Sequence, residues 1–154
     1  MLGPATIFER IAEEVKTALL QADIPGIEER VERAREDAVT FDDGDSLNVM
    51  MDSNSQKVFS ESIDDNELLV DVCISVRATG DSANVWETKA DEYARQIHPV
   101  VMRRNYFAAG LKIARVRLTD QDWQAEAGDN TPGKRTLKYS VRFLTLADDI
   151  TQQP

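Results

Sequence analysis

The spacing of apolar residues predicts two amphipathic helices. Over residues 4–23 apolar side chains recur every three or four positions while charged ones take the other face, and Ile24-Pro25-Gly26 ends the pattern. A second stripe predicts a helix over residues 83–103. Pro99 lies inside this stripe, so we expect a kink or an early end near Ile97 to His98.

Alternating apolar and polar positions predict strands between and after the helices. The clearest is residues 68–76, where even-numbered positions are apolar, and further strands are expected at 47–51, 111–122 and 137–146. The alternation slips between Ile113 and Ala114, which predicts a bulge. Residues 52–55 have turn chemistry, with a short return strand expected at 57–60, and residues 126–135 are expected to form a polar loop.

Residues 27–36, IEERVERARE, are highly charged and lack a wide apolar face. Helix propensity alone favours a helix here, but Pro-Gly directly precedes the segment. We therefore predict a charged edge strand, since charges on an edge discourage unwanted strand pairing.

These elements predict an α+β fold in the order α-β-β-β-α-β-β, with two amphipathic helices packed on one face of a mainly antiparallel sheet. Residues 1–150 are expected to form one domain and residues 151–154 a loose tail. The predicted core consists of Phe8, Ile11, Val15, Leu19, Leu68, Val70, Val72, Ile74, Trp86, Tyr93, Ile97, Val116, Val141 and Phe143.

Charge is distributed unevenly in this chain of 154 residues with net charge −10. The first 77 residues carry 18 acidic and 7 basic side chains, whereas the last 77 carry 10 and 11. One interpretation is a solvated acidic surface that maintains solubility; the other is two faces of different potential, which suits head-to-tail self-association. An acidic chain is a poor candidate for clamping phosphate backbones.

The sequence offers little for catalysis. It contains one histidine, His98, and one cysteine, Cys73, which we expect to be a small buried hydrophobe in a reducing compartment. Gly128 to Lys134 have phosphate-loop spacing, but Arg135 replaces the serine or threonine and a strand follows instead of a helix, so a hairpin loop is expected. No enzyme activity, metal or other cofactor is predicted, and neither a signal peptide nor a membrane span is expected.

The whole pattern resembles the tail terminator proteins of long-tailed bacteriophages, also called minor tail or tail completion proteins. The resemblance runs from Ile7 to Asp149, through IFERIAEEVKTALLQADI, VERARED, LLVDVCISVRA, ETKADEYARQIHPVVM and KIARVRLTD. It is most specific in the closing LKYSVRFLTLADD. The chain departs from that family at Ala34, where relatives often carry glycine, and it lacks a Leu-Pro-Ala before the next strand.

This resemblance implies a structural virion protein. Such proteins form a ring, usually a hexamer, that caps the head-proximal end of the tail tube, ends tube polymerisation and provides the docking surface for the capsid neck. The implied partners are further copies of the chain, the tail tube protein, a sheath if the tail is contractile, and a neck or head-completion protein. The implied location is the virion tail, after assembly in the host cytoplasm. The alternative is another head–tail connector or baseplate subunit of the same kind of particle.

Two charged groups are the candidates for subunit contacts in such a ring. Arg30, Arg33 and Arg35 would form one side, and Asp64 and Asp65 the other. Asp42, Asp43 and Asp45 are predicted to form a loop that faces the lumen or the tube. DNA would pass through this lumen without specific binding, along a neutral to acidic wall.

Overall fold

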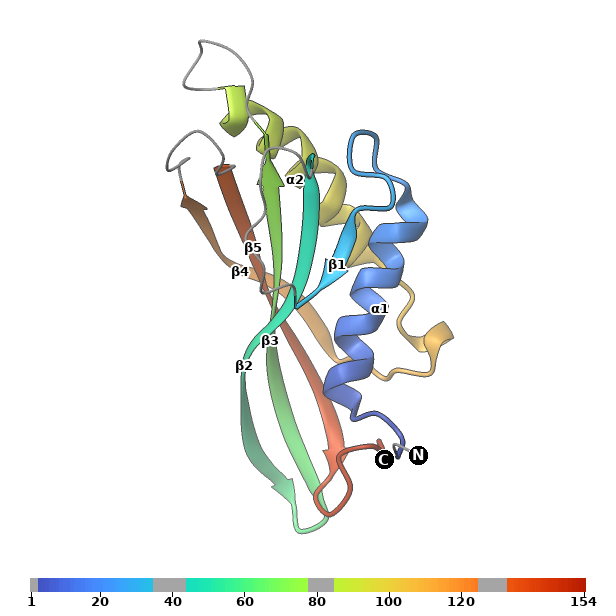
Figure 1. The fold of residues 1–154 in the computed structure, drawn as a ribbon. Helices are drawn as coiled ribbons and strands as arrows, with labels where there is room; N and C mark the ends of the chain where they lie inside the picture. The colour runs from blue at the N-terminus through green and yellow to red at the C-terminus, as the bar shows by residue number, and fades with distance from the viewer. Residues whose placement is uncertain (1–2, 35–43, 78–84, 125–132) are drawn as a thin grey trace.

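The described part of the chain forms two α-helices and one five-stranded sheet (Figure 1). The computed structural model describes residues 3–34, 44–77, 85–124 and 133–154. The elements are α1 (Ile7–Ala22), β1 (Val31–Arg33), β2 (Ser46–Ser60), β3 (Ile63–Val76), α2 (Val85–Arg103), the 3-10 helix η2 (Phe107–Ala109), β4 (Arg115–Gln124) and β5 (Gly133–Leu146). The predicted α+β class is confirmed.

The sheet has the strand order β1-β2-β3-β5-β4. Among the described strands only the β1–β2 pair is parallel, and the other three pairs are antiparallel. The two helices contact each other; α1 also contacts β1 and β2, and α2 contacts β3 and β5. Their apolar stripes share one hydrophobic core with the even-numbered residues 68–76 of β3. The opposite face of the sheet carries no helix in the described part of the chain (Figure 1).

Helix α1 begins and ends with capping contacts. Thr6 is the N-cap, and its Oγ1 accepts a hydrogen bond from the Glu9 backbone N–H at 3.2 Å. Asp23 closes the helix in the left-handed conformation, directly before Ile24-Pro25. The stripe Ile7, Ile11, Ala12, Val15, Ala18 and Leu19 is buried, as the spacing predicted.

Helix α2 passes through Pro99 and continues to Arg103, so the expected early end near Ile97 to His98 is wrong. Proline removes one backbone donor, but Ile97 and Val101 on either side are both buried in the core. The Tyr106 hydroxyl also donates to the Val101 carbonyl at 2.9 Å, which holds the last turn in place. Packing therefore outweighs the local preference of proline.

Strands β2 and β3 form one long hairpin that extends beyond the start of α1 (Figure 1). The turn expected at 52–55 and the return strand at 57–60 are wrong, because β2 pairs with β3 from Ser46 to Ser60. The polar residues interrupt this pairing only by irregularities, at Met51/Ser53 and Val58/Ser60. All residues of β2 from Met51 to Ser60 are exposed.

The charged segment forms an edge strand, but a shorter one than predicted: only Val31–Arg33 pair with β2. Ala34 directly after it adopts a left-handed conformation (φ 49°) and donates its N–H to Val49 O at 3.0 Å. An L-residue with a Cβ is strained in this region, which glycine occupies readily.

The closing strands differ in their bounds from the sequence prediction. β4 begins at Arg115, and its irregularity falls between Leu118 and Asp120 instead of Ile113 and Ala114. β5 begins at Gly133, four residues earlier than predicted. A Cβ at Gly133 would lie 2.4 Å from the Trp86 ring, so the glycine lets α2 pack closely against the strand.

The last residues make hydrogen bonds to Lys112 and to β5, and the loose tail expected at residues 151–154 stays a prediction. The Gln153 side chain accepts from Lys112 N at 2.8 Å and donates to Lys112 O at 2.9 Å and to Leu144 O at 3.0 Å. The predicted core is confirmed except at Phe8 and Val116, which are partly buried.

Candidate functional site

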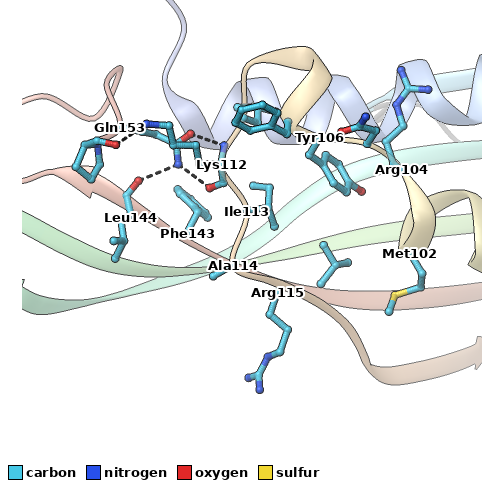
Figure 2. Close-up of a pocket in the computed structure, with 15 residues that line it drawn as sticks. Met102, Arg104, Tyr106, Lys112, Ile113, Ala114, Arg115, Phe143, Leu144 and Gln153 are labelled. Carbon is cyan, nitrogen blue, oxygen red and sulfur yellow. Dashed lines mark hydrogen bonds between the residues drawn. The ribbon is translucent and has the colours of Figure 1, made fainter.

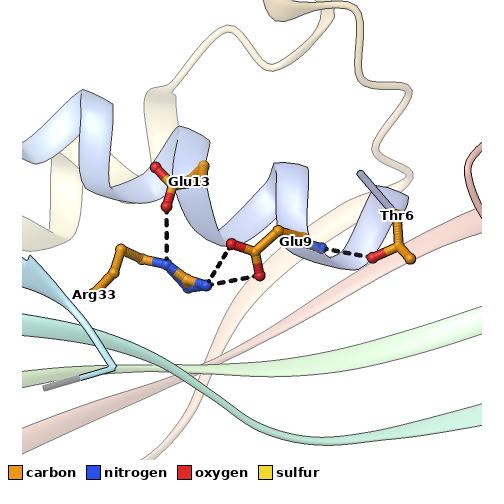
Figure 3. Close-up of polar contacts among 4 residues, drawn as sticks. All are labelled: Thr6, Glu9, Glu13 and Arg33. Atoms are coloured by element: carbon orange, nitrogen blue, oxygen red, sulfur yellow. Dashed lines mark hydrogen bonds and ion pairs between the residues drawn. The ribbon is translucent and has the colours of Figure 1, made fainter. Parts of the chain in front are cut away.

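The predicted interface residue Arg33 is engaged within its own chain (Figure 3). Its Nη2 lies 2.8 Å from Glu9 Oε2, and its Nε lies 3.3 Å from Glu13 Oε1. Glu9 and Glu13 are one helical turn apart, so both face β1. The contact fastens α1 to the edge strand, and the role of Arg33 in a subunit contact stays a prediction.

Arg30 is also used locally. Its Nε donates to Asp45 O at 2.8 Å and its Nη2 to Gly26 O. Arg35, the third predicted cation, lies outside the described residues. The two described cations of this group therefore hold the β1 segment to its own fold.

The Asp45 side chain is buried within its own chain, and its place in a loop that faces the lumen or the tube stays a prediction. Its side chain is 7% exposed. One carboxylate oxygen accepts from Arg77 N at 2.8 Å, and the other accepts from the Tyr93 hydroxyl at 2.5 Å and lies 3.0 Å from Lys89 Nζ. Burial, and then the hydrogen bond to Asp45, raise the pKa of Tyr93. Asp42 and Asp43 lie outside the described residues.

Asp64 and Asp65 lie close to the tip of the β2–β3 hairpin, opposite Val58 and Lys57. Asp65 pairs with Arg142 of β5 at 2.7 Å. Both aspartates are partly exposed. The acidic side of the predicted contact is thus at one end of the sheet, and its assignment to an interface stays a prediction.

Two large apolar side chains project at this hairpin tip. Val58 is 81% exposed and Phe59 is 63% exposed. Glu61 and Ser62 form the turn beside them. The hairpin tip, defined here as residues 57–65, thus combines exposed apolar surface with the carboxylates of Glu61, Asp64 and Asp65. The sequence analysis overlooked the Val58-Phe59 pair because it assigned these residues to a minor return strand.

A groove of about 620 Å³ lies at the other side of the sheet, where the chain leaves η2 and enters β4 (Figure 2). Tyr106, Leu111 and Phe143 are buried beneath it. Met102, Phe107, Ile113 and Val116 add further apolar lining, and Phe107 is 74% exposed. Two cations, Arg104 and Lys112, also line the groove, whereas the Arg115 side chain points away from it (Figure 2). We call this feature the η2 groove.

The helix-free face of the sheet carries both signs of charge. Register places on it the carboxylates of Asp65, Glu67, Asp71, Asp120 and Asp122 and the cations of Lys57, Arg115, Arg117, Lys134, Lys138 and Arg142. Burial, together with the neighbouring Asp52 carboxylate, raises the pKa of Asp71, and Lys138 partly offsets this. Cys73 is partly exposed on this face, so the expectation of a buried cysteine is wrong.

His98 makes a structural contact. Its Nδ1 is 3.0 Å from the Tyr139 hydroxyl, and the two rings stack with centroids 5.8 Å apart. Within the described ranges no group of three or more His, Cys, Asp or Glu side chains is placed to hold a metal ion. No described helix has the length and apolar content to cross a membrane.

Comparison with known proteins adds no family. No protein-family model matches the chain, and no curated protein is significantly similar to it.

Proposed function

We propose that this chain is a ring-forming subunit of a long-tailed bacteriophage that terminates the tail tube at its head-proximal end. The alternative is another connector or baseplate subunit of the same kind of particle. The observation that carries the proposal is the placement of the closing motif. Tyr139, Val141, Phe143 and Thr145 all point from β5 into the core, so the part of the sequence with the most specific resemblance forms the centre of the fold.

Two further contacts explain why this motif is structural. Thr145 Oγ1 accepts from the buried Asn66 side chain at 2.9 Å, which links β5 to β3. Asp149 accepts from Thr151 N at 3.0 Å and from Thr151 Oγ1 at 2.6 Å, and these bonds lower its pKa. The residues of this motif therefore serve in packing and in a turn, as expected of a sequence pattern that identifies a fold and contains no catalytic site.

Ala34 also supports the proposal. It is the position at which the chain departs from the family, whose members often carry glycine there, and its φ of 49° lies in the region that favours glycine. The backbone geometry typical of a glycine is therefore retained although the residue has changed.

The expected assembly is a ring of six copies, observable as a hexameric mass in solution and as a ring with an open lumen by electron microscopy. When the chain is mixed with purified tail tubes, the ring should lie at one end of each tube and stop further growth. Tube protein alone is the control and should continue to polymerise. A monomer with bound metal or nucleotide, or a chain that ignores tube ends, would contradict the proposal.

A lumen through which DNA slides should not retain it. The helix-free face mixes both signs of charge, and the chain as a whole carries −10. We therefore expect no measurable binding of duplex DNA at physiological salt in a fluorescence anisotropy titration. Tight binding that falls steeply with added salt would show a basic wall and contradict this expectation.

A further inference from the structure

We propose that the hairpin tip of one copy inserts into the η2 groove of the next copy, and that this contact builds the ring. The inference rests on the proposed function, because it specifies how the copies of that ring meet. Its occupant is a second copy of this chain, with Val58 and Phe59 as the inserted side chains.

The first argument is position within the sheet. The strand order β1-β2-β3-β5-β4 places the outer edge of β2, which carries Val58 and Phe59, on one side of β3 and the η2 groove on the other, at the β4 side of β5. Two different patches at opposite edges of the sheet make a heterologous contact, which closes into a ring when the rotation per copy is right. A self-complementary patch would give only a dimer.

The second argument is that the tip is an unprotected edge. β1 pairs with β2 only at Leu47–Val49, so the outer side of β2 from Met51 to Ser60 pairs with no described strand. Long exposed edges with apolar side chains invite association, and proteins normally shorten or cover them. Exposing both Val58 and Phe59 at such an edge is costly unless another surface covers them.

The third argument is chemical complementarity. The groove offers apolar lining from Phe107, Ile113 and Val116, and its volume of about 620 Å³ is ample for the two tip side chains. Its cations include Arg104 and Lys112, whereas the tip carries Glu61 and Asp64. Opposite charges at the edge of an apolar contact fix its register and orientation.

The groove is also held open by its own chain. The Gln153 side chain bonds both Lys112 N and Lys112 O, and Lys112 Nζ donates to Pro154 O at 2.7 Å (Figure 2). These bonds fix the segment that leads into β4 against β5. A groove that is ordered before binding costs less conformational entropy when the tip inserts.

Cysteine cross-linking tests the contact directly. In a Cys73→Ser background, Val58→Cys and Phe107→Cys are made in separate chains and mixed under mild oxidation. We expect disulfide-linked dimers in the mixture and in neither variant alone, because the contact joins two different patches. Equal dimer yields in the single-variant samples, or none in the mixture, would overturn the inference.

Assembly measurements provide the second test. Phe59→Ser should weaken ring assembly by about tenfold or more, because one buried aromatic side chain is lost per contact. The control is Trp123→Ser, since Trp123 is also exposed but lies under Arg135, 4.9 Å from the guanidinium carbon, at the other end of β4. It should assemble like the wild type in native mass spectrometry.

Charge reversal probes the polar contacts of the same interface. Lys112→Glu should weaken assembly, and adding Glu61→Arg in the same chain should restore it. Added salt should weaken wild-type assembly as well. Each variant is first checked for unchanged thermal unfolding, since both positions are exposed.

The outcomes separate this inference from the proposed function. A wild-type ring that Phe59→Ser leaves intact overturns the tip contact, even if tube capping persists. Phe59→Ser rings that no longer bind tube ends would place the tip against the tube and also overturn the inference. A wild-type chain that remains monomeric at every soluble concentration overturns it too. A ring built by the tip contact that ignores tube ends would instead contradict only the tail-terminator function.

Discussion

Val72→Asp is expected to abolish soluble, folded protein. Val72 has no exposed surface and lies between Val49 of β2 and Leu137 of β5 in the sheet. A carboxylate there would face the shared core of both helices, with no partner for its charge. The cost should exceed about 4 kcal/mol, a large share of the roughly 5–15 kcal/mol that stabilises a typical domain. Soluble yield and circular dichroism of any recovered protein measure the effect.

The matched control is Val58→Asp, the same substitution at a side chain that is 81% exposed. Its free energy of unfolding as a monomer should stay within about 0.5 kcal/mol of the wild type. The contrast isolates burial from any general effect of the added charge. Normal folding of Val72→Asp would mean that the helix-facing side of β3 is assigned wrongly.

The elements with strong periodicity could be predicted from the sequence. In α1 the apolar residues recur every three or four positions, and in β3 they recur every second position. Each period matches that of one face of a helix or of a strand, so each pattern indicates a single buried face. Cross-strand contacts then place Val141 and Phe143 of β5 on the same face. These positions are determined locally, so the sequence pattern suffices.

The long hairpin could not be predicted in this way. Asp52-Ser53-Asn54-Ser55 has the composition of a turn, yet pairing with β3 keeps the whole segment extended. Turn propensity is weak compared with a continuous ladder of backbone hydrogen bonds along a neighbouring strand. Only a partner strand of matching length, β3, decides the outcome, and its pairing is not visible in the local sequence.

The candidate site shows the same limit. Arg33 was predicted to face another subunit because its segment is charged, but Glu9 and Glu13 on the polar face of α1 already neutralise it. The four-residue spacing of the two glutamates indicates that both lie on one face of the helix, where they can pair with one arginine. The η2 groove had no such signal, because it joins residues 102–116 to Phe143, Leu144 and the last two residues.

Asp45→Ala is expected to destabilise the fold by roughly 3 kcal/mol. The buried carboxylate accepts hydrogen bonds from the Tyr93 hydroxyl and the Arg77 N–H. Alanine would leave both donors without an acceptor next to the core, and such unsatisfied groups cost about 1–3 kcal/mol each. For a chain of this size the melting temperature should fall by about 6–12 °C. A thermal melt followed by circular dichroism measures this.

Asp120→Ala provides the control for that loss. Asp120 is exposed on β4, and its carboxylate accepts from the backbone N–H of the next residue, Gln121. Removing an exposed carboxylate should change the free energy of unfolding by no more than about 0.5 kcal/mol. If both variants melted at the wild-type temperature, Asp45 would not be the buried link between the start of β2 and α2. The prediction that Asp45 belongs to a loop facing the lumen or the tube would then gain support, because exposed loop carboxylates contribute little to stability.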